Sequence, residues 1–148
     1  MSSEPLLEEA FIVEGRDYVR AGSASIEVKK TLEGLGIDAE TIRRVAIIVY
    51  EAEMNVALYA DRGEVRLLVF PDEIRLEIED RGQGIENIEM ALQDGYSTAT
   101  DEMRELGFGA GMGLPNIKRN SDEFSITSTV GEGTKLSVGI NLKVDEPS

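Results

Sequence analysis

The sequence predicts an α+β protein, and three stretches carry this prediction. A long run with one apolar face begins after Asp38, which suits a helix N-cap, and ends near residues 60–63. Segments 64–70 and 73–79 predict a hairpin, because apolar and charged residues alternate in the second of them. A further pair of strands is expected in the C-terminal region, at 123–129 and 135–142. Amphipathic helices together with paired strands indicate helices that pack on a sheet.

The remaining predicted elements are shorter. They are a strand within 8–14, a helix within 17–32, and short helices at 87–92 and 114–119. Gly34 and Gly36 end the first helix, and Gly22 within it leaves its starting point open. The segment 93–106 is polar and irregular, which indicates a mobile stretch ahead of a glycine-rich loop.

The composition is that of one soluble domain. The chain has 148 residues, 41% hydrophobic and 30% charged, and no apolar run approaches the ~18 residues of a membrane span. We therefore expect a single domain over 1–148, with frayed ends at about 1–7 and 145–148. The first residues lack the basic and apolar regions of a secretory signal, so the cytoplasm is the expected location.

Charge and missing residue types exclude several classes of function. The chain contains no cysteine and no histidine, which excludes disulfides, thiolate or imidazole metal ligands and a phosphohistidine relay. A metal would have to be a hard, oxygen-bound ion such as Mg²⁺. The net charge of −14 argues against binding to nucleic acid or to an anionic membrane, since both require a basic face. A basic protein partner remains open.

A loop of alternating glycines precedes the predicted helix at 114–119. Its glycines are Gly107, Gly109, Gly111 and Gly113, followed by Leu114. Glycine backbone can approach a ligand closely, and N–H groups at a loop-to-helix junction favour an anion such as phosphate. The loop fits neither the Walker pattern nor the dinucleotide pattern, because Met112 stands where the latter needs its third glycine. A plain surface loop is the alternative.

Glu51 and Asn55 lie four residues apart on the long predicted helix. This spacing puts both side chains on one face, one turn apart. There Asn55 can ligate Mg²⁺, while Glu51 can accept a proton from an attacking hydroxyl or water. A solvated polar face is the alternative, and spacing alone favours it.

A second group of polar residues lies near two predicted strand ends. Asp80 closes a strand and is followed by Gly82 and Gly84. A fixed carboxylate can accept a hydrogen bond from an exocyclic amine, and the glycines let a flat base approach the backbone. Thr134 offers a hydroxyl that can join Asp80 around such a base. Each feature also fits an ordinary turn or hairpin.

Together, four segments occur in the order and context of the N, G1, G2 and Gly-Thr boxes of the GHKL ATP-binding superfamily. They are 51–55, 80–84, 107–114 and 131–134. The chain resembles this superfamily over nearly all of its length. Residues 93–98 and 113–124 look much like those of the bacterial anti-sigma factor serine kinases and the stress-response switch kinases.

The resemblance implies a Bergerat-type two-layer α/β sandwich, with a mixed sheet covered on one face by helices. ATP would lie under a mobile lid at about 94–106. By position, Glu51 would be the general base, Asn55 the Mg²⁺ ligand and Asp80 the partner of the adenine amine. The other implied ATP-binding positions are Gly82, Gly84, Gly107, Gly109, Gly111, Gly113, Leu114 and Thr134.

The resemblance also implies a function. Members of this size transfer the γ-phosphoryl group of ATP to a serine of an anti-anti-sigma protein of the STAS type, and so regulate transcription or stress signalling. Several also bind a sigma factor, and homodimers are common. The alternatives are an ATP-gated module that sequesters a sigma factor or another protein, and a simple ATPase. An intact Glu51 favours chemistry, because a purely sequestering module needs no base.

Overall fold

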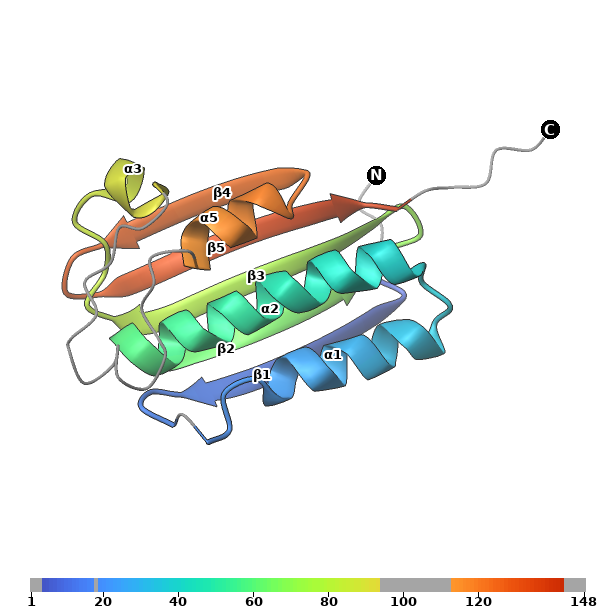
Figure 1. The fold of residues 1–148 in the computed structure, drawn as a ribbon, viewed down its shortest axis with the longest axis horizontal. Coiled ribbons are helices and arrows are strands. Elements are labelled where there is room, and N and C mark those ends of the chain that lie inside the picture. Colours follow the sequence, from blue (N-terminus) through green and yellow to red (C-terminus); the bar gives the residue numbers. More distant parts are fainter. Residues whose placement is uncertain (1–3, 18, 94–112, 143–148) are drawn as a thin grey trace.

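The computed structural model describes residues 4–17, 19–93 and 113–142, and these form two layers (Figure 1). One layer is a sheet. The other consists of three helices, α1, α2 and α5, which lie on the same face of that sheet, and the short α3 lies at one end. In chain order the elements are β1 (Leu7–Glu14), α1 (Ser23–Gly34), α2 (Ala39–Tyr59), β2 (Ala60–Val69), β3 (Glu73–Gly82), α3 (Ile88–Ala91), α5 (Gly113–Arg119), β4 (Glu123–Thr129) and β5 (Gly133–Asn141).

The sheet has five strands in the order β1-β2-β3-β5-β4. The predicted α+β class and the helical cover on one face are confirmed. The mixed sheet that we expected differs in one respect, since all four strand pairings of the described chain are antiparallel. For two of these pairings the reason lies in the connections: β2–β3 and β4–β5 are hairpins with short turns, which join antiparallel strands only.

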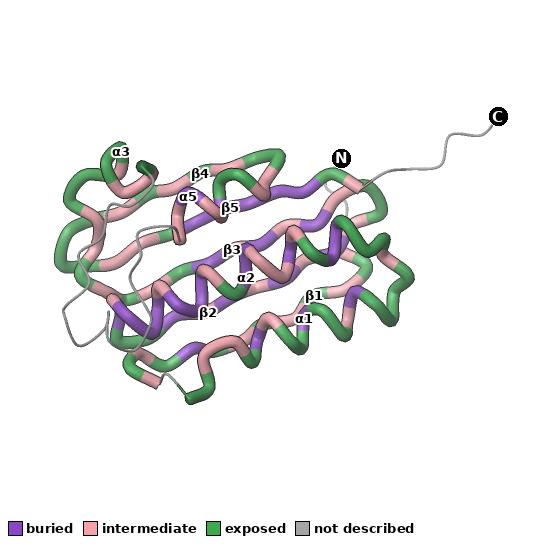
Figure 2. Tube along the Cα trace, in the orientation of Figure 1, coloured by how far each residue is buried: buried purple, intermediate pink, exposed green. Residues whose placement is uncertain are grey.

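The core lies between the sheet and α2. Alternate residues of the three central strands are buried, namely Val65, Leu67, Val69, Ile74, Leu76, Ile78, Leu136, Val138 and Ile140. On α2 the buried stripe repeats at helical spacing and includes Val45, Ile48, Ala52 and Val56. Figure 2 shows the same division, with buried residues concentrated on the central strands and along α2. Both periodicities match those that predicted the elements.

The opposite face of the sheet is polar. Arg66 pairs with Glu8 and Glu64, each at 2.6 Å, and so ties β2 to its neighbour β1. Arg75 of β3 lies 3.1 Å from Glu123 of β4. These half-exposed pairs suit a face that remains in contact with water. None of the described helices combines the length and the apolar character needed to span a membrane.

Helix α1 begins at Ser23, which settles the starting point that the sequence pattern left open. Gly22 occupies the N-cap with a φ of 101°, a conformation that glycine adopts at no steric cost. The carboxylate of Glu53 accepts hydrogen bonds from the backbone N–H groups of Gly22, Ala24 and Ser25 at 2.7 to 3.2 Å. The side chain that caps this helix therefore comes from α2, far along the chain, and local pattern does not reveal it.

The junction of α2 with the sheet is tighter than predicted, because β2 begins ahead of the expected start at residue 64. Tyr59 ends the helix and Ala60 already belongs to β2. A Cβ on Gly63 would lie 2.6 Å from a methyl carbon of Val56, so glycine permits the close crossing of helix and strand. Asp80 pairs with Gly63 inside β3, and is therefore a residue of the strand itself rather than of the turn after it.

Candidate active site

The predicted site residues that the structure describes gather at one end of the molecule. The C-terminal half of α2, the end of β3 and the starts of α5 and β5 lie together there (Figure 1). These elements carry Glu51 and Asn55, Asp80, Gly113 and Thr134, respectively. Gly107, Gly109, Gly111 and the expected lid at 94–106 lie outside the described residues.

Gly113 brings the end of the glycine loop against α2. A Cβ at this position would lie 3.0 Å from Asn55 Oδ1 and 3.4 Å from Glu51 Oε2. One backbone position thus faces both side chains, as their four-residue spacing predicts. The first of these distances is tighter than most Cβ contacts, so any larger residue at 113 would press on the Asn55 amide.

Glu51 is half-buried between α2 and α5. Burial raises the pKa of its carboxyl above the ordinary value, and a hydrogen bond with the Asn116 side chain opposes this rise. Asn116 is a residue that the sequence analysis did not assign to the site. Its position one helical turn after Gly113 is the signal that indicates it, because residues three apart on a helix share a face.

Asp80 is held by backbone N–H groups at the end of the sheet. The N–H of Thr134 donates to Asp80 Oδ1 at 3.2 Å. Burial raises the pKa of the Asp80 carboxyl, while the N–H groups of Thr134 and Gly82 act in the opposite direction. An ionised carboxylate offers about four acceptor positions, so the group retains capacity for a further donor such as an amine.

Thr134 lies next to Asp80 as expected, but its hydroxyl points elsewhere. Its Oγ1 is 2.8 Å from Ser128 Oγ across the β4–β5 hairpin. Ser128 Oγ in turn accepts the N–H of Ile85 at 2.7 Å. The contact between Thr134 and Asp80 thus runs through the Thr134 backbone, and Ser128 anchors the turn after β3.

Close backbone packing requires glycine at positions 82 and 84. A Cβ on Gly82 would lie 2.7 Å from the carbonyl oxygen of Tyr59 at the end of α2. Gly84 has a φ of 76°, and a Cβ there would lie 2.4 Å from the carbonyl oxygen of Thr129. Both glycines thus let the turn after β3 pack against neighbouring backbone. Leu114 is half-buried and packs against the core.

An open groove of about 630 Å³ lies between α1 and α2 and reaches Glu51. Lys29 lines it from α1, Ile37 from the connection, and Ile47 and Tyr50 from α2. Glu51 therefore borders this groove and also lies against the start of α5 at Gly113.

Comparison with known proteins decides the family. Residues 17–140 match the histidine kinase-like ATPase domain, and this stretch includes all four of the sequence boxes. The chain belongs to this family. The GHKL-type domain predicted from the sequence is thus confirmed, the two-layer architecture agrees with its Bergerat fold, and membership implies that the domain binds ATP.

Individual relatives within the histidine kinase-like ATPase family agree with the predicted subgroup. The serine/threonine-protein kinase RsbT of Bacillus subtilis is 34% identical over 124 residues, which cover 81% of this chain and 85% of the relative. The anti-sigma F factor of Clostridium acetobutylicum is 32% identical over 118 residues, covering 76% and 79%. That of Caldanaerobacter subterraneus subsp. tengcongensis is 32% identical over 100 residues, covering 64% and 66%.

Proposed function

We propose that this protein is an ATP- and Mg²⁺-dependent serine kinase whose acceptor is a serine of an anti-anti-sigma protein of the STAS type. The observation that carries the proposal is the setting of Glu51. Its carboxylate lies beside Gly113 at the end of the glycine loop and also borders an open groove. A base placed between a phosphate site and a space for a polypeptide is what phosphoryl transfer to protein requires. A purely sequestering module has no use for it.

ATP and Mg²⁺ fit the residues present. The half-buried Asp80 has acceptor capacity for the adenine amine, and the start of α5 at Gly113 offers backbone N–H groups to phosphate. Asn55 Oδ1, directed at Gly113, is an oxygen ligand of the kind that Mg²⁺ prefers. Among the described residues no cluster of three or more acidic side chains could hold a metal. A Mg²⁺ ion would therefore complete its shell with phosphate oxygens and water.

In this mechanism Glu51 accepts the proton of the acceptor hydroxyl as its oxygen bonds to the γ-phosphorus and ADP leaves. Burial brings the pKa of Glu51 upward, toward the pH at which it works, and this makes the carboxylate a better base. Bound Mg²⁺ would neutralise charge on the phosphates. The chain's own contribution is positioning. Asp80 would hold the adenine ring, and Asn55 and the glycine loop would hold the phosphates in place relative to Glu51.

The groove beside α2 is the proposed seat of the serine-bearing segment of the acceptor. Its wall contains apolar side chains and Tyr50, which is 43% exposed. Lys29, Arg43 and Glu33 also line it, and charges of both signs beside an apolar strip suit an amphipathic segment of a partner. Because Glu51 lines the groove, a segment bound in it can present a hydroxyl to the proposed general base.

Sequestration of a sigma factor is the second candidate function, because two of the relatives named above are anti-sigma F factors. A sigma factor is therefore a second proposed partner, and a homodimer in the cytoplasm is the proposed state of the protein. Sequestration and transfer need not exclude each other, since ATP can bias one conformation for each partner.

The test is incubation with γ-labelled ATP, Mg²⁺ and a STAS-domain protein from the same genome, followed by mapping of the label. We expect label on a serine of the STAS protein, and a strongly reduced residual rate of labelling in Glu51→Gln, with nucleotide binding retained. Glu27→Gln is the matched control, because Glu27 is exposed on α1, where its carboxylate lies 3.8 Å from the Lys30 ammonium. Bound ATP without transfer would favour sequestration. Release of phosphate without an acceptor would favour a simple ATPase.

A further inference from the structure

Asn116 connects the proposed base to the helix that begins at the end of the glycine loop. Its side chain hydrogen-bonds Glu51 across the interface between α5 and α2. We infer that Asn116 is a positioning residue, which orients the Glu51 carboxylate toward the acceptor and ties this orientation to the position of α5. The inference rests on the proposed function insofar as Glu51 is taken to be the base, whereas the contact itself is a property of the nucleotide-free protein.

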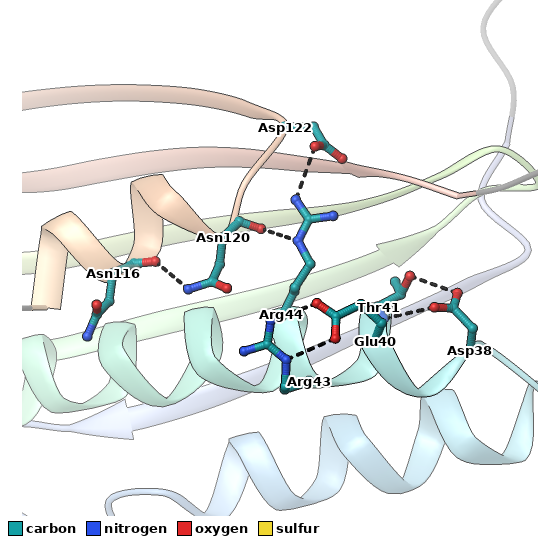
Figure 3. A network of polar contacts seen from close by, with 8 residues as sticks. All are labelled: Asp38, Glu40, Thr41, Arg43, Arg44, Asn116, Asn120 and Asp122. Carbon is teal, nitrogen blue, oxygen red and sulfur yellow. Dashed lines mark hydrogen bonds and ion pairs between the residues drawn. The ribbon is translucent and has the colours of Figure 1, made fainter.

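Arg119 determines which end of the Asn116 amide faces Glu51. Arg119 Nη1 donates to Asn116 Oδ1 at 2.9 Å, so the amide oxygen is already engaged. An ionised carboxylate can only accept hydrogen bonds. The amide NH₂ group of Asn116 is therefore the group that donates to Glu51. Figure 3 shows the Asn116 side chain extending from α5 toward α2. The carboxylate thus receives its donor in one defined orientation.

The far end of α5 is fixed to α2 by a separate set of contacts (Figure 3). Arg44 of α2 donates from Nε to the carbonyl oxygen of Asn120 at 3.0 Å, and from Nη2 to Asp122 Oδ1 at 3.1 Å. Asn120 Nδ2 donates to the carbonyl oxygen of Asn116 at 2.8 Å. Ile117, next to Asn116, has no exposed surface. The backbone of Asn116 is therefore held in place independently of Glu51.

The start of the same helix meets the site. Gly113 faces Asn55 and Glu51, and Asn116 follows it by one helical turn. Because Asn116 lies on the same turn, its fixed backbone sets the direction in which the Glu51 carboxylate is held relative to Gly113. The residue that faces the proposed phosphate site and the residue that orients the base are thus linked by a single turn of helix.

Loss of the Asn116 amide should slow the chemical step and leave nucleotide binding intact. For Asn116→Leu we expect kcat of transfer to the STAS acceptor to fall about 10- to 100-fold, the usual effect of removing a hydrogen bond to a charged group. The KM for ATP should change less than about 3-fold. Asn116→Gln keeps an amide and should recover part of the rate. Lys118→Leu is the control, because Lys118 is exposed on the same helix.

A double-mutant comparison shows whether the effect passes through Glu51. In the background of Glu51→Gln, the further change Asn116→Leu should have little additional effect, since residues that act as a unit are not additive. Equal losses in both backgrounds, or full activity of Asn116→Leu, would overturn the inference. If Asn116→Leu unfolds, Asn116→Ser, which removes the amide with a smaller change, takes its place in the cycle.

A second readout needs no activity. The side-chain NH₂ resonances of Asn116 in a ¹⁵N correlation spectrum of nucleotide-free protein should move in Glu51→Gln and stay in place in Glu27→Gln. Unchanged Asn116 resonances in Glu51→Gln would contradict the contact. Wild-type protein that transfers no label would refute the proposed function, and this NMR comparison would then still decide whether Asn116 orients Glu51.

Discussion

Replacement of Gly113 by alanine is the most direct probe of the site geometry. The added Cβ would lie 3.0 Å from Asn55 Oδ1 and 3.4 Å from its Nδ2, so the Asn55 amide must move by a few tenths of an ångström. The backbone itself accepts alanine, because Gly113 is the first residue of α5 and is absent from the positive-φ glycines. The perturbation therefore acts on the proposed Mg²⁺ ligand and its surroundings.

The size of the effect follows from overpacking. Insertion of a methyl group into a tight site costs about 1–3 kcal/mol. Mg·ATP binding requires the Asn55 amide in its original position, against the added methyl group. The cost therefore appears as an affinity for Mg·ATP that is about 10- to 100-fold weaker. Stability without nucleotide should fall much less, because the Asn55 amide is only half-buried and can turn away, and because alanine stabilises a helix relative to glycine by about 1 kcal/mol.

Isothermal titration with Mg·ATP and thermal unfolding of the nucleotide-free protein measure these two quantities. Gly34→Ala is the matched control, because no heavy atom lies within 4 Å of the Cβ that would be added there. It should leave affinity unchanged. Affinity of Gly113→Ala within about 2-fold of the wild type, with a normal unfolding temperature, would refute the assignment of Asn55 and Gly113 to one phosphate site.

Two further predictions concern buried carboxylates. Glu53 is 1% exposed and accepts hydrogen bonds from three backbone N–H groups. Glu53→Ala should therefore lower the free energy of unfolding, measured by urea titration, by about 2–4 kcal/mol. A loss below about 0.5 kcal/mol would contradict its capping role. Burial raises the pKa of Asp80 above the ordinary 3.8, so its carboxyl binds its proton more tightly in the folded state. The stabilisation it gives is complete below about pH 4 and is lost as the pH rises through the folded value. Asp80→Asn removes this loss, and its stability relative to wild type should rise over that pH range in denaturation curves; a difference independent of pH would refute the assignment.

Local patterns predicted the features that depend on neighbours in the chain. The apolar stripe of α2, the alternation in β3 and the N-cap at Asp38, whose side chain accepts the Thr41 N–H, are all found. The shared face of Glu51 and Asn55 follows from helix geometry in the same way. These features need no knowledge of what packs against the element, and they fix the general shape of the candidate site.

The features that escaped prediction depend on partners far away in sequence. The start of α1 is set by Glu53, and the direction of the Thr134 hydroxyl is set by Ser128. Asn116 contacts Glu51 only because α5 packs against α2. Patterns in one segment carry no record of such contacts, so the residues that surround a site are harder to predict than those on its central helix.

Three polar residues of α2 show how one helix can serve both structure and site. Glu51, Glu53 and Asn55 are spaced by two residues, and successive residues of a helix turn by about 100°. Glu53 consequently points toward α1, which it caps, while Glu51 and Asn55 face Gly113 and the start of α5. The intervening residues Ala52 and Val56 are buried against the sheet. Helix α2, which carries the proposed base, is thus in contact with α1, with α5 and with the sheet. A mutation in the core beneath α2 should therefore lower both the stability of this helix and the rate of catalysis.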